Sequence, residues 1–366
     1  ELLLEVGLQL AEVRRLLLAL AREHLTTVLI AQTHHRPGQP TTVAHYLTAV
    51  EDMLARDSER VSQAYARMNR CPLGAAALAG TSHPLDREAT AAALGFDGPV
   101  ENTYDAVASA DWEVDLASVS ASLALDLGRF VNDLLTWAAA DHYVLDDDLV
   151  QGSSIMPQKR NPVALEHART RLSRVLGSAG MVTYSSHNIP FTDLNDFGPD
   201  IQGGLVILHR QLGGALELIK ACLQGGDFDR ARLAAAAART DTTATELADV
   251  LARDAGLGFP VAHRVVAALV RRLTAEGRAL ASATPDDLVA AGGPRLDAAT
   301  LAQALDPAAF VARRSGLGMP APEAMRERLV RVGERLEGDL RALRERKDAL
   351  ATARERLRDP ERSMSR

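Results

Sequence analysis

The sequence predicts an all-α protein, a long central helical bundle with a smaller helical domain toward the C-terminus. Aromatic residues make up only 4% of the 366 residues, whereas strands are enriched in aromatic and β-branched residues. Ala, Leu, Arg and Glu, which favour helices, dominate the composition. Several long segments also repeat apolar residues at helical spacing, and such helices must bury their apolar stripes against one another.

The first half of the chain holds three of these helices. Apolar residues recur at helical spacing from residue 1 to about 25, from about 41 to 69 and from about 110 to 142. The prolines and glycine between residues 37 and 40 forbid a regular helix there. We expect the preceding Thr33-His34-His35 to lie at a helix end. The small residues of CPLGAAALAGTSHPLDR predict a loop before the third helix.

Helical pattern returns from about 162 to 184 and, after SSHNIPFTDLNDFGPD, continues to about 223. Beyond Gly225-Gly226 the helical segments become shorter. We therefore predict a bundle in 1–225, a helical C-terminal domain in 226–322 and a charged helix with a tail in 323–366. The charges of the last helix are expected to form a solvated face, which could serve as a partner surface. Because the chain opens inside an amphipathic segment, we expect an N-terminal domain upstream.

Bulk properties exclude several classes of protein. The net charge of −7 and the pI of about 5.8 do not favour nucleic-acid binding. Neither a membrane-spanning apolar run nor a secretory signal is visible in the sequence. Cys71 and Cys222 lack metal-ligand spacing and make no disulfide framework, which favours a reduced, cytoplasmic setting. A helix-borne H-E-x-x-H is absent, so no zinc site is expected.

The polar loop GSSIMPQKRNP, residues 152–162, interrupts the helices. Lys159 within it is one of only three lysines among 41 Lys and Arg residues. A compact ammonium suits a carboxylate in a tight pocket, which would explain a lysine at this position. The alternative is that a lysine occurs here by chance. Ser153 and Ser154 follow a glycine; a serine acts as a base only where its alkoxide is stabilised. Helix capping or flexibility is the alternative for this pair.

A histidine could complete the chemistry. His34, if held by a carboxylate, could move a proton near neutral pH. Glu166 and Glu101 are candidate partners by residue type only, and a surface histidine is the alternative. The sequence has neither a G-x-S-x-G elbow nor a P-loop, so a hydrolase triad and a nucleotide phosphate site are not supported.

Together these segments resemble the fumarase/aspartase superfamily. Its signature G-S-S-x-M-P-x-K-x-N is matched at every fixed position by GSSIMPQKRN. Within the superfamily the chain is most similar to the argininosuccinate lyase group, through MPQKRNP, CPLGAAALAGTSHPLDR, ENTYDAVASADW and the stretch from TDTTATELADV to GLGMPAPEA. The resemblance runs from about residue 1 to 325, leaving only the last helix outside. It implies a cytoplasmic homotetramer built on a helical bundle, with each active site shared by three subunits and no cofactor or metal.

The resemblance also implies a reaction. Anti-elimination would split a C–N bond of an N-substituted aspartate, with argininosuccinate as the default substrate and arginine and fumarate as products. Ser153 would take the Cβ proton, and His34, paired with Glu166, would assist departure of the amine. Removing that proton puts a second charge on the neighbouring carboxylate, so pre-placed donors and cations are needed. The residues expected to hold the substrate are Thr33, Gln39, Ser154, Lys159 and Asn161.

Several segments depart from the group's pattern. The upstream Ser/Arg/Asn clamp does not occur in the chain, and ASADW lacks the Arg that normally precedes its aspartate. THHRPGQP lacks the usual Leu-Gln-Arg-Ala. PFTDLNDF, with Asp193, Asn195 and Asp196, replaces a Tyr-Asn-Lys-Asp-like run. These changes suggest another N-substituted aspartate, such as ethylenediamine-disuccinate or a secondary-metabolite precursor.

Three further interpretations stay open. One is a cycloisomerase of the same superfamily, and the second is an inactive structural homologue like those reused in the eye lens. The third is a helical scaffold that binds partners through its last amphipathic helix.

Overall fold

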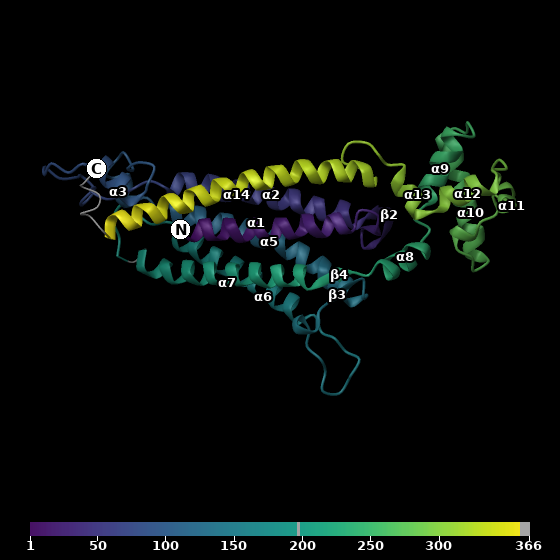
Figure 1. Cartoon of the computed structure of the whole chain (residues 1–366), viewed down its shortest axis with the longest axis horizontal. Coiled ribbons are helices and arrows are strands. Elements are labelled where there is room, and N and C mark those ends of the chain that lie inside the picture. Colours follow the sequence, from purple (N-terminus) through teal and green to yellow (C-terminus); the bar gives the residue numbers. More distant parts are fainter. Residues whose placement is uncertain (196–197, 359–366) are drawn as a thin grey trace.

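The computed structural model describes residues 1–195 and 198–358. Long helices lie side by side over most of the length of the molecule, and short helices gather at one end (Figure 1). The predicted all-α bundle is thereby confirmed, with two short two-stranded sheets in addition. The long helices are α1 (Leu2–Glu23), α2 (Val43–Met68), α5 (Asp111–Ala139), α6 (Val163–Ser185), α7 (Gly198–Gln224) and α14 (Pro322–Arg358).

The observed boundaries follow from local capping. Helix α2 starts at Val43, two residues later than predicted, because Thr42 caps it: its hydroxyl accepts the His45 N–H at 3.0 Å. Helix α5 ends at Ala139, where the chain turns through Asp141 at a φ of 52°. The connection between α2 and α5 holds two short helices, α3 (Arg87–Leu94) and α4 (Asp105–Ala108).

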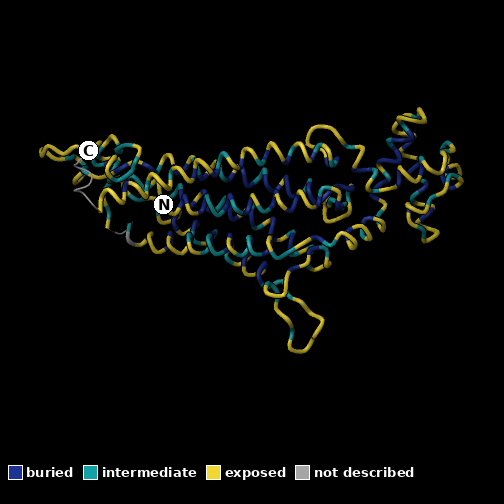
Figure 2. Tube along the Cα trace, viewed as in Figure 1, coloured by how far each residue is buried: buried dark blue, intermediate teal, exposed yellow. Residues whose placement is uncertain are grey.

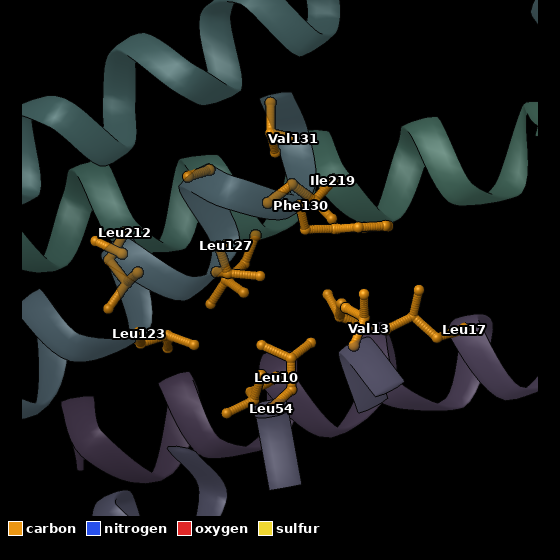
Figure 3. Packing of buried hydrophobic residues seen from close by; sticks show 14 of the residues in the cluster. Leu10, Val13, Leu17, Leu54, Leu123, Leu127, Phe130, Val131, Leu212 and Ile219 are labelled. Atoms are coloured by element: carbon orange, nitrogen blue, oxygen red, sulfur yellow. The ribbon is translucent and has the colours of Figure 1, made fainter. Parts of the chain in front are cut away.

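The bundle core consists of aliphatic side chains and a few aromatic rings. Leu10 and Leu17 of α1 share one cluster with Leu127 and Phe130 of α5 and Ile219 of α7 (Figure 3). All five are at most 1% exposed, and burying each contributes about 1.5–3 kcal/mol. Buried positions follow the facing sides of the helices, whereas the outer sides are exposed (Figure 2).

Helix α14 packs in this bundle as well. Leu329, Leu336 and Leu340 on one of its faces belong to the same core cluster, and the helix contacts α1 and α2. Arg14 of α1 is fully buried, and it pairs with Glu51 of α2 at 2.7 Å and with Asp339 of α14 at 2.7 Å. The sequence predicts an amphipathic helix with a solvated charged face, and the structure shows its apolar face buried in the bundle.

The short helices form a separate hydrophobic cluster that includes residues from Leu247 to Leu305. The bundle cluster extends to Leu233 and resumes at Leu329. The division at 225 and 322 stays a prediction, which the two clusters favour; residues 359–366 of the predicted tail lie outside the described residues. The short elements are α8 (Arg230–Ala238), α9 (Ala244–Arg253), α10 (Phe259–Ala275), η2 (Leu280–Ser282), α11 (Pro285–Ala290), α12 (Ala298–Leu305) and α13 (Pro307–Ala312).

Two antiparallel two-stranded sheets hold the segments between the long helices. Strands β1 (Val28–Thr33) and β2 (Arg36–Thr42) form a hairpin between α1 and α2. Strand β3 (Tyr143–Leu145) pairs with β4 (Gly226–Phe228), and the short helix η1 (Asp147–Leu149) leads from β3 into the loop 152–160. Within the described residues, no helix combines the length and apolar character that a membrane crossing requires.

Candidate active site

Thr33 and His34 lie at the tip of the β1–β2 hairpin. The register pairs Thr33 with Arg36, so His34 and His35 form a two-residue turn. Their φ values of 53° and 58° match the positive φ that type I′ hairpin turns require. The prediction that this segment lies at a helix end is wrong. Helix α1 ends at Glu23, and the apolar and β-branched start of VLIAQT favours an extended strand.

The backbone of this turn is strained, because residues other than glycine rarely adopt a positive φ. Such conformations persist where the surrounding structure enforces them, and they cluster at functional sites. The side chains of Thr33, His34 and His35 are all exposed. The hairpin therefore presents His34 at the surface, where a substrate or a second chain can reach it.

Gln39, on the returning strand, connects the hairpin with the C-terminal helices. Its Nε2 donates to the Thr245 hydroxyl of α9 at 3.3 Å. Beside it lies a cavity of about 640 Å³ between the hairpin, α2, α5 and residues 314–320. In its wall Tyr46 donates to Asp133 at 2.5 Å, and burial raises the pKa of the Tyr46 phenol. Sequence reasoning missed this cavity, since its lining comes from segments far apart in the chain.

The two ends of the signature loop, residues 152–160, are joined where the loop leaves and re-enters the fold. The Gln151 and Asn161 backbones exchange two hydrogen bonds, both of 2.9 Å. The Asn161 side chain also donates from Nδ2 to the Gln151 carbonyl at 2.9 Å. Asn161, predicted to hold the substrate, therefore braces the loop in this structure.

Ser153 sits inside a turn of this loop. Its hydroxyl oxygen accepts the Met156 N–H at 3.1 Å and the Ile155 N–H at 3.4 Å. Backbone donors aimed at an oxygen stabilise negative charge on it. Ser154 and Lys159 are exposed on the same loop, so the two serines, Lys159 and Asn161 lie within one nine-residue segment.

Glu166 lies in the first turn of α6, where the helix dipole favours an acidic residue. Its side chain is exposed. Among the described residues, no hydrogen bond or ion pair joins it to His34. The same holds for Glu101, whose backbone carbonyl accepts from Arg87 at 3.2 Å.

The predicted site residues thus fall into two groups within one chain. The hairpin group is Thr33, His34 and Gln39, and the loop group is Ser153, Ser154, Lys159, Asn161 and Glu166. In residues 1–195 and 198–358, no hydrogen bond or ion pair joins the two groups. The loop projects away from the bundle, whereas the hairpin lies near the short helices (Figure 1).

Two segments compared with the family pattern above meet in the structure. Tyr104, in ENTYDAVASADW, stacks on Phe191, in PFTDLNDF, with ring centroids 5.8 Å apart. Both rings are substantially exposed, at 44% and 60%. Asn188, three residues before Phe191, has a φ of 62°. Asp196, named with this segment above, lies outside the described residues.

No group of three or more His, Cys, Asp or Glu side chains in the described part of the chain is placed to hold a metal ion. The groups that the two segments offer to a substrate are hydroxyls, amides, an ammonium and an imidazole. Such groups suit an anionic substrate and proton transfer.

Comparison with known proteins gives a consistent assignment. A family model described as Lyase matches residues 3–177, and a model described as Argininosuccinate lyase C-terminal matches residues 241–312. The argininosuccinate lyase of Natronomonas pharaonis is 40% identical over 93% of this chain and 69% of that protein. The argininosuccinate lyase of Methanoculleus marisnigri is 36% identical over 95% of this chain and 71% of that protein.

Among solved structures, a crystal structure of EDDS lyase in complex with formate is similar with a TM-score of 0.91 and 31% identity. The match covers 98% of this chain and 73% of that one. It therefore includes part of the last helix, and the expectation that this helix lies outside the resemblance is wrong.

Proposed function

This chain belongs to the argininosuccinate lyase family, and from that premise we propose that it splits argininosuccinate into arginine and fumarate. The reaction class is a carbon–nitrogen lyase. The observation that carries the proposal is the closed signature loop, which holds Ser153, Ser154, Lys159 and Asn161 in one segment of a chain similar to argininosuccinate lyases over most of its length.

Ser153 acts as the base in this proposal. It removes the proton from Cβ of the aspartate part of the substrate, and the electron pair moves onto the adjacent carboxylate. The Met156 and Ile155 N–H groups that already face its oxygen stabilise the serine alkoxide. Lys159 supplies a cation for the resulting dianion, and Ser154 and Asn161 supply donors.

His34 acts on the leaving group. The pair of electrons on the dianion forms the C=C bond of fumarate as the C–N bond breaks, and the amine nitrogen takes a proton from His34. Glu166 would orient and charge the imidazole. Thr33 and Gln39 would bind a substrate carboxylate beside the hairpin turn.

We propose that the sites assemble between subunits of a homotetramer. Among the described residues, no hydrogen bond or ion pair joins the hairpin group to the loop group within one chain, and in this proposal a second copy completes the site. Support comes from large apolar side chains exposed on the long helices α5, α6 and α7, since contiguous exposed apolar surface marks protein interfaces. These residues are Leu125, Met181, Tyr184, Val206 and Ile207, each 40–81% exposed.

A cytoplasmic location is the corresponding proposal for the cellular compartment. Cys71 and Cys222 are both buried and unpaired. Unpaired thiols are the rule in reducing compartments.

A second candidate substrate is another N-substituted aspartate of the ethylenediamine-disuccinate kind. The match to the EDDS lyase structure supports it. Phe191, which stacks on Tyr104, lies in PFTDLNDF, the segment that replaces the Tyr-Asn-Lys-Asp-like run, and this departure also favours another substrate.

The test is fumarate release by ultraviolet absorbance, from argininosuccinate and a panel of N-substituted aspartates. Ser153→Ala is the matched control, because Ser153 is on an exposed loop and its hydroxyl contacts only that loop. We expect wild type to release fumarate from argininosuccinate and the variant to lose at least about a thousandfold in kcat, with unchanged helix content.

Other outcomes redirect the assignment. Serine-dependent fumarate from another aspartate derivative alone would move the substrate and keep the mechanism. An absence of fumarate from every compound would overturn the proposal and favour the cycloisomerase or inactive-homologue interpretation.

A further inference from the structure

Arg160 lies in the signature loop between Lys159 and Asn161, and its guanidinium reaches out of the loop. Its Nη2 donates to the Leu145 carbonyl of β3 at 2.7 Å. Its Nη1 pairs with the Asp147 carboxylate of η1. Both acceptors precede the loop in the chain, so this one side chain ties the end of the loop to the ribbon from which the loop departs.

The acceptor on β3 is firmly held. Strand β3 pairs with β4, with Leu145 opposite Gly226, and the Tyr143 hydroxyl donates to the Cys222 carbonyl at 2.6 Å. Strand β4 is held in turn by the end of α1, where the fully buried His24 contacts Asp227 at 2.6 Å. The ribbon therefore connects the loop with the bundle.

The loop has a departing limb, residues 152–158, and a returning limb, residues 159–161, and the two differ in how they are attached to the rest of the chain. In the described part of the chain, the hydrogen bonds of residues 152–158 stay within the loop. A Cβ on Gly152 would meet nothing within 4 Å, and Ile155 is 83% exposed. The departing limb is therefore open to movement, whereas the returning limb is tied to β3 and η1 through Arg160.

We propose that Arg160 is a positioning residue for the elimination. It holds the returning limb on the β3–β4 ribbon, so that Lys159 and Ser153 reach a bound dicarboxylate in a fixed geometry. The proposal rests on the proposed function of the loop. The neighbouring Lys159 side chain is exposed. With Arg160 bonded to β3 and η1, the exposed Lys159 ammonium stays available to a substrate.

For holding the loop, the ability of the guanidinium to donate to two acceptors matters more than its charge. The Arg160 and Asp147 side chains are 48% and 86% exposed, and exposed ion pairs contribute little on their own. A guanidinium can donate to two acceptors at once in fixed geometry, which a lysine ammonium on a flexible stem reproduces poorly. Global stability should therefore depend weakly on Arg160, while the geometry of the loop depends on it strongly.

The test compares Arg160→Ala, Arg160→Lys and Asp147→Ala in the full chain, with the exposed Arg169→Ala of α6 as the matched control. We expect Arg160→Ala to lower kcat for fumarate release about tenfold or more, because small misplacements of catalytic groups cost that much. The change in KM should be smaller, since Arg160 touches no substrate in this proposal. Arg160→Lys and Asp147→Ala should retain intermediate kcat values, and Arg169→Ala should equal wild type.

Amide hydrogen exchange provides a readout that does not need turnover. The Asn161 N–H bonded to Gln151 and the Lys159 N–H bonded to Met156 should exchange faster in Arg160→Ala, with the melting temperature unchanged. A kcat within twofold of Arg169→Ala, together with unchanged exchange, would overturn the proposal. If wild type itself released no fumarate, the proposed function would fail, and exchange alone would decide whether Arg160 holds the loop.

Discussion

At the scale of single residues, the buried charged side chains Arg14 and Glu113 differ in whether a hydrogen-bonding partner compensates them. Arg14 is fully buried and has two carboxylate partners, so its charge is compensated. Glu113 of α5 is only 6% exposed, and its Oε2 has no hydrogen-bond partner among the described residues. Burial, and secondarily the neighbouring Asp111, raise the pKa of Glu113 to about 7. The uncompensated carboxylate makes stability depend on pH.

We predict that Glu113→Gln stabilises the fold above neutral pH. Below pH 4.5 the carboxyl is protonated in both the folded and unfolded states, so it carries no cost. As the pH rises through about 7, the folded state must hold a buried anion, and the stability present at low pH is lost. Thermal unfolding at pH 4.5 to 8.5 should show wild type melting at least about 2 °C below Glu113→Gln at the alkaline end. The two should coincide at the acid end.

The control for this experiment is Glu88→Gln on α3, because Glu88 is exposed. Its melting profile should parallel that of wild type at every pH. Parallel profiles for Glu113→Gln as well would show that the Glu113 carboxylate is solvated in the folded protein.

At the scale of elements, helix α14 shows how a narrow apolar stripe joins a bundle. Leu329, Leu336 and Leu343 recur at seven-residue intervals and are 1–8% exposed, although the helix is rich in Arg and Glu. Seven-residue spacing keeps a stripe on one face of a helix. Close approach to α1 is possible because Gly7 there has no side chain: a Cβ would meet Leu343 at 3.0 Å.

We predict that Leu336→Ala lowers the free energy of unfolding by about 2–5 kcal/mol, as buried Leu→Ala changes do. Val330 on the same helix is 60% exposed, so Val330→Ala should change it by less than about 0.5 kcal/mol. Urea unfolding followed by circular dichroism gives both values. Equal small effects would mean that α14 does not pack on the bundle in solution, and would favour the interpretation that this helix binds partners.

The long helices could be predicted from the sequence because their apolar periodicity is a local signal. The hairpin could not be predicted, because its turn is made by His34 and His35. Two-residue hairpin turns are typically indicated by Asn-Gly or Asp-Gly pairs. The signature loop could be located by its motif, whereas the contact of Arg160 with Leu145 depends on which backbone carbonyl the fold brings near. Motifs identify reacting groups; the groups that position them depend on tertiary contacts.

At the scale of the whole molecule, the proposed reacting groups are carried by separate parts of one chain. The hairpin tip with His34 and the loop with Ser153 share no hydrogen bond or ion pair in the described residues. The loop extends away from the bundle (Figure 1). An elimination needs base and acid on the same substrate, and this requirement underlies the proposal that copies of the chain supply them to each other.

We predict that two inactive variants restore activity when they are mixed. Ser153→Ala and His34→Ala should each lack fumarate release, because each loses one proton-transfer group. In a mixed oligomer whose sites take Ser153 from one chain and His34 from another, some sites contain neither substitution. Unfolding and refolding the two together should therefore recover a measurable fraction of wild-type kcat per chain, while each variant refolded alone stays inactive. If the mixture stayed inactive although size-exclusion chromatography showed mixed oligomers, Ser153 and His34 would have to act within one chain, and the shared-site proposal would be wrong.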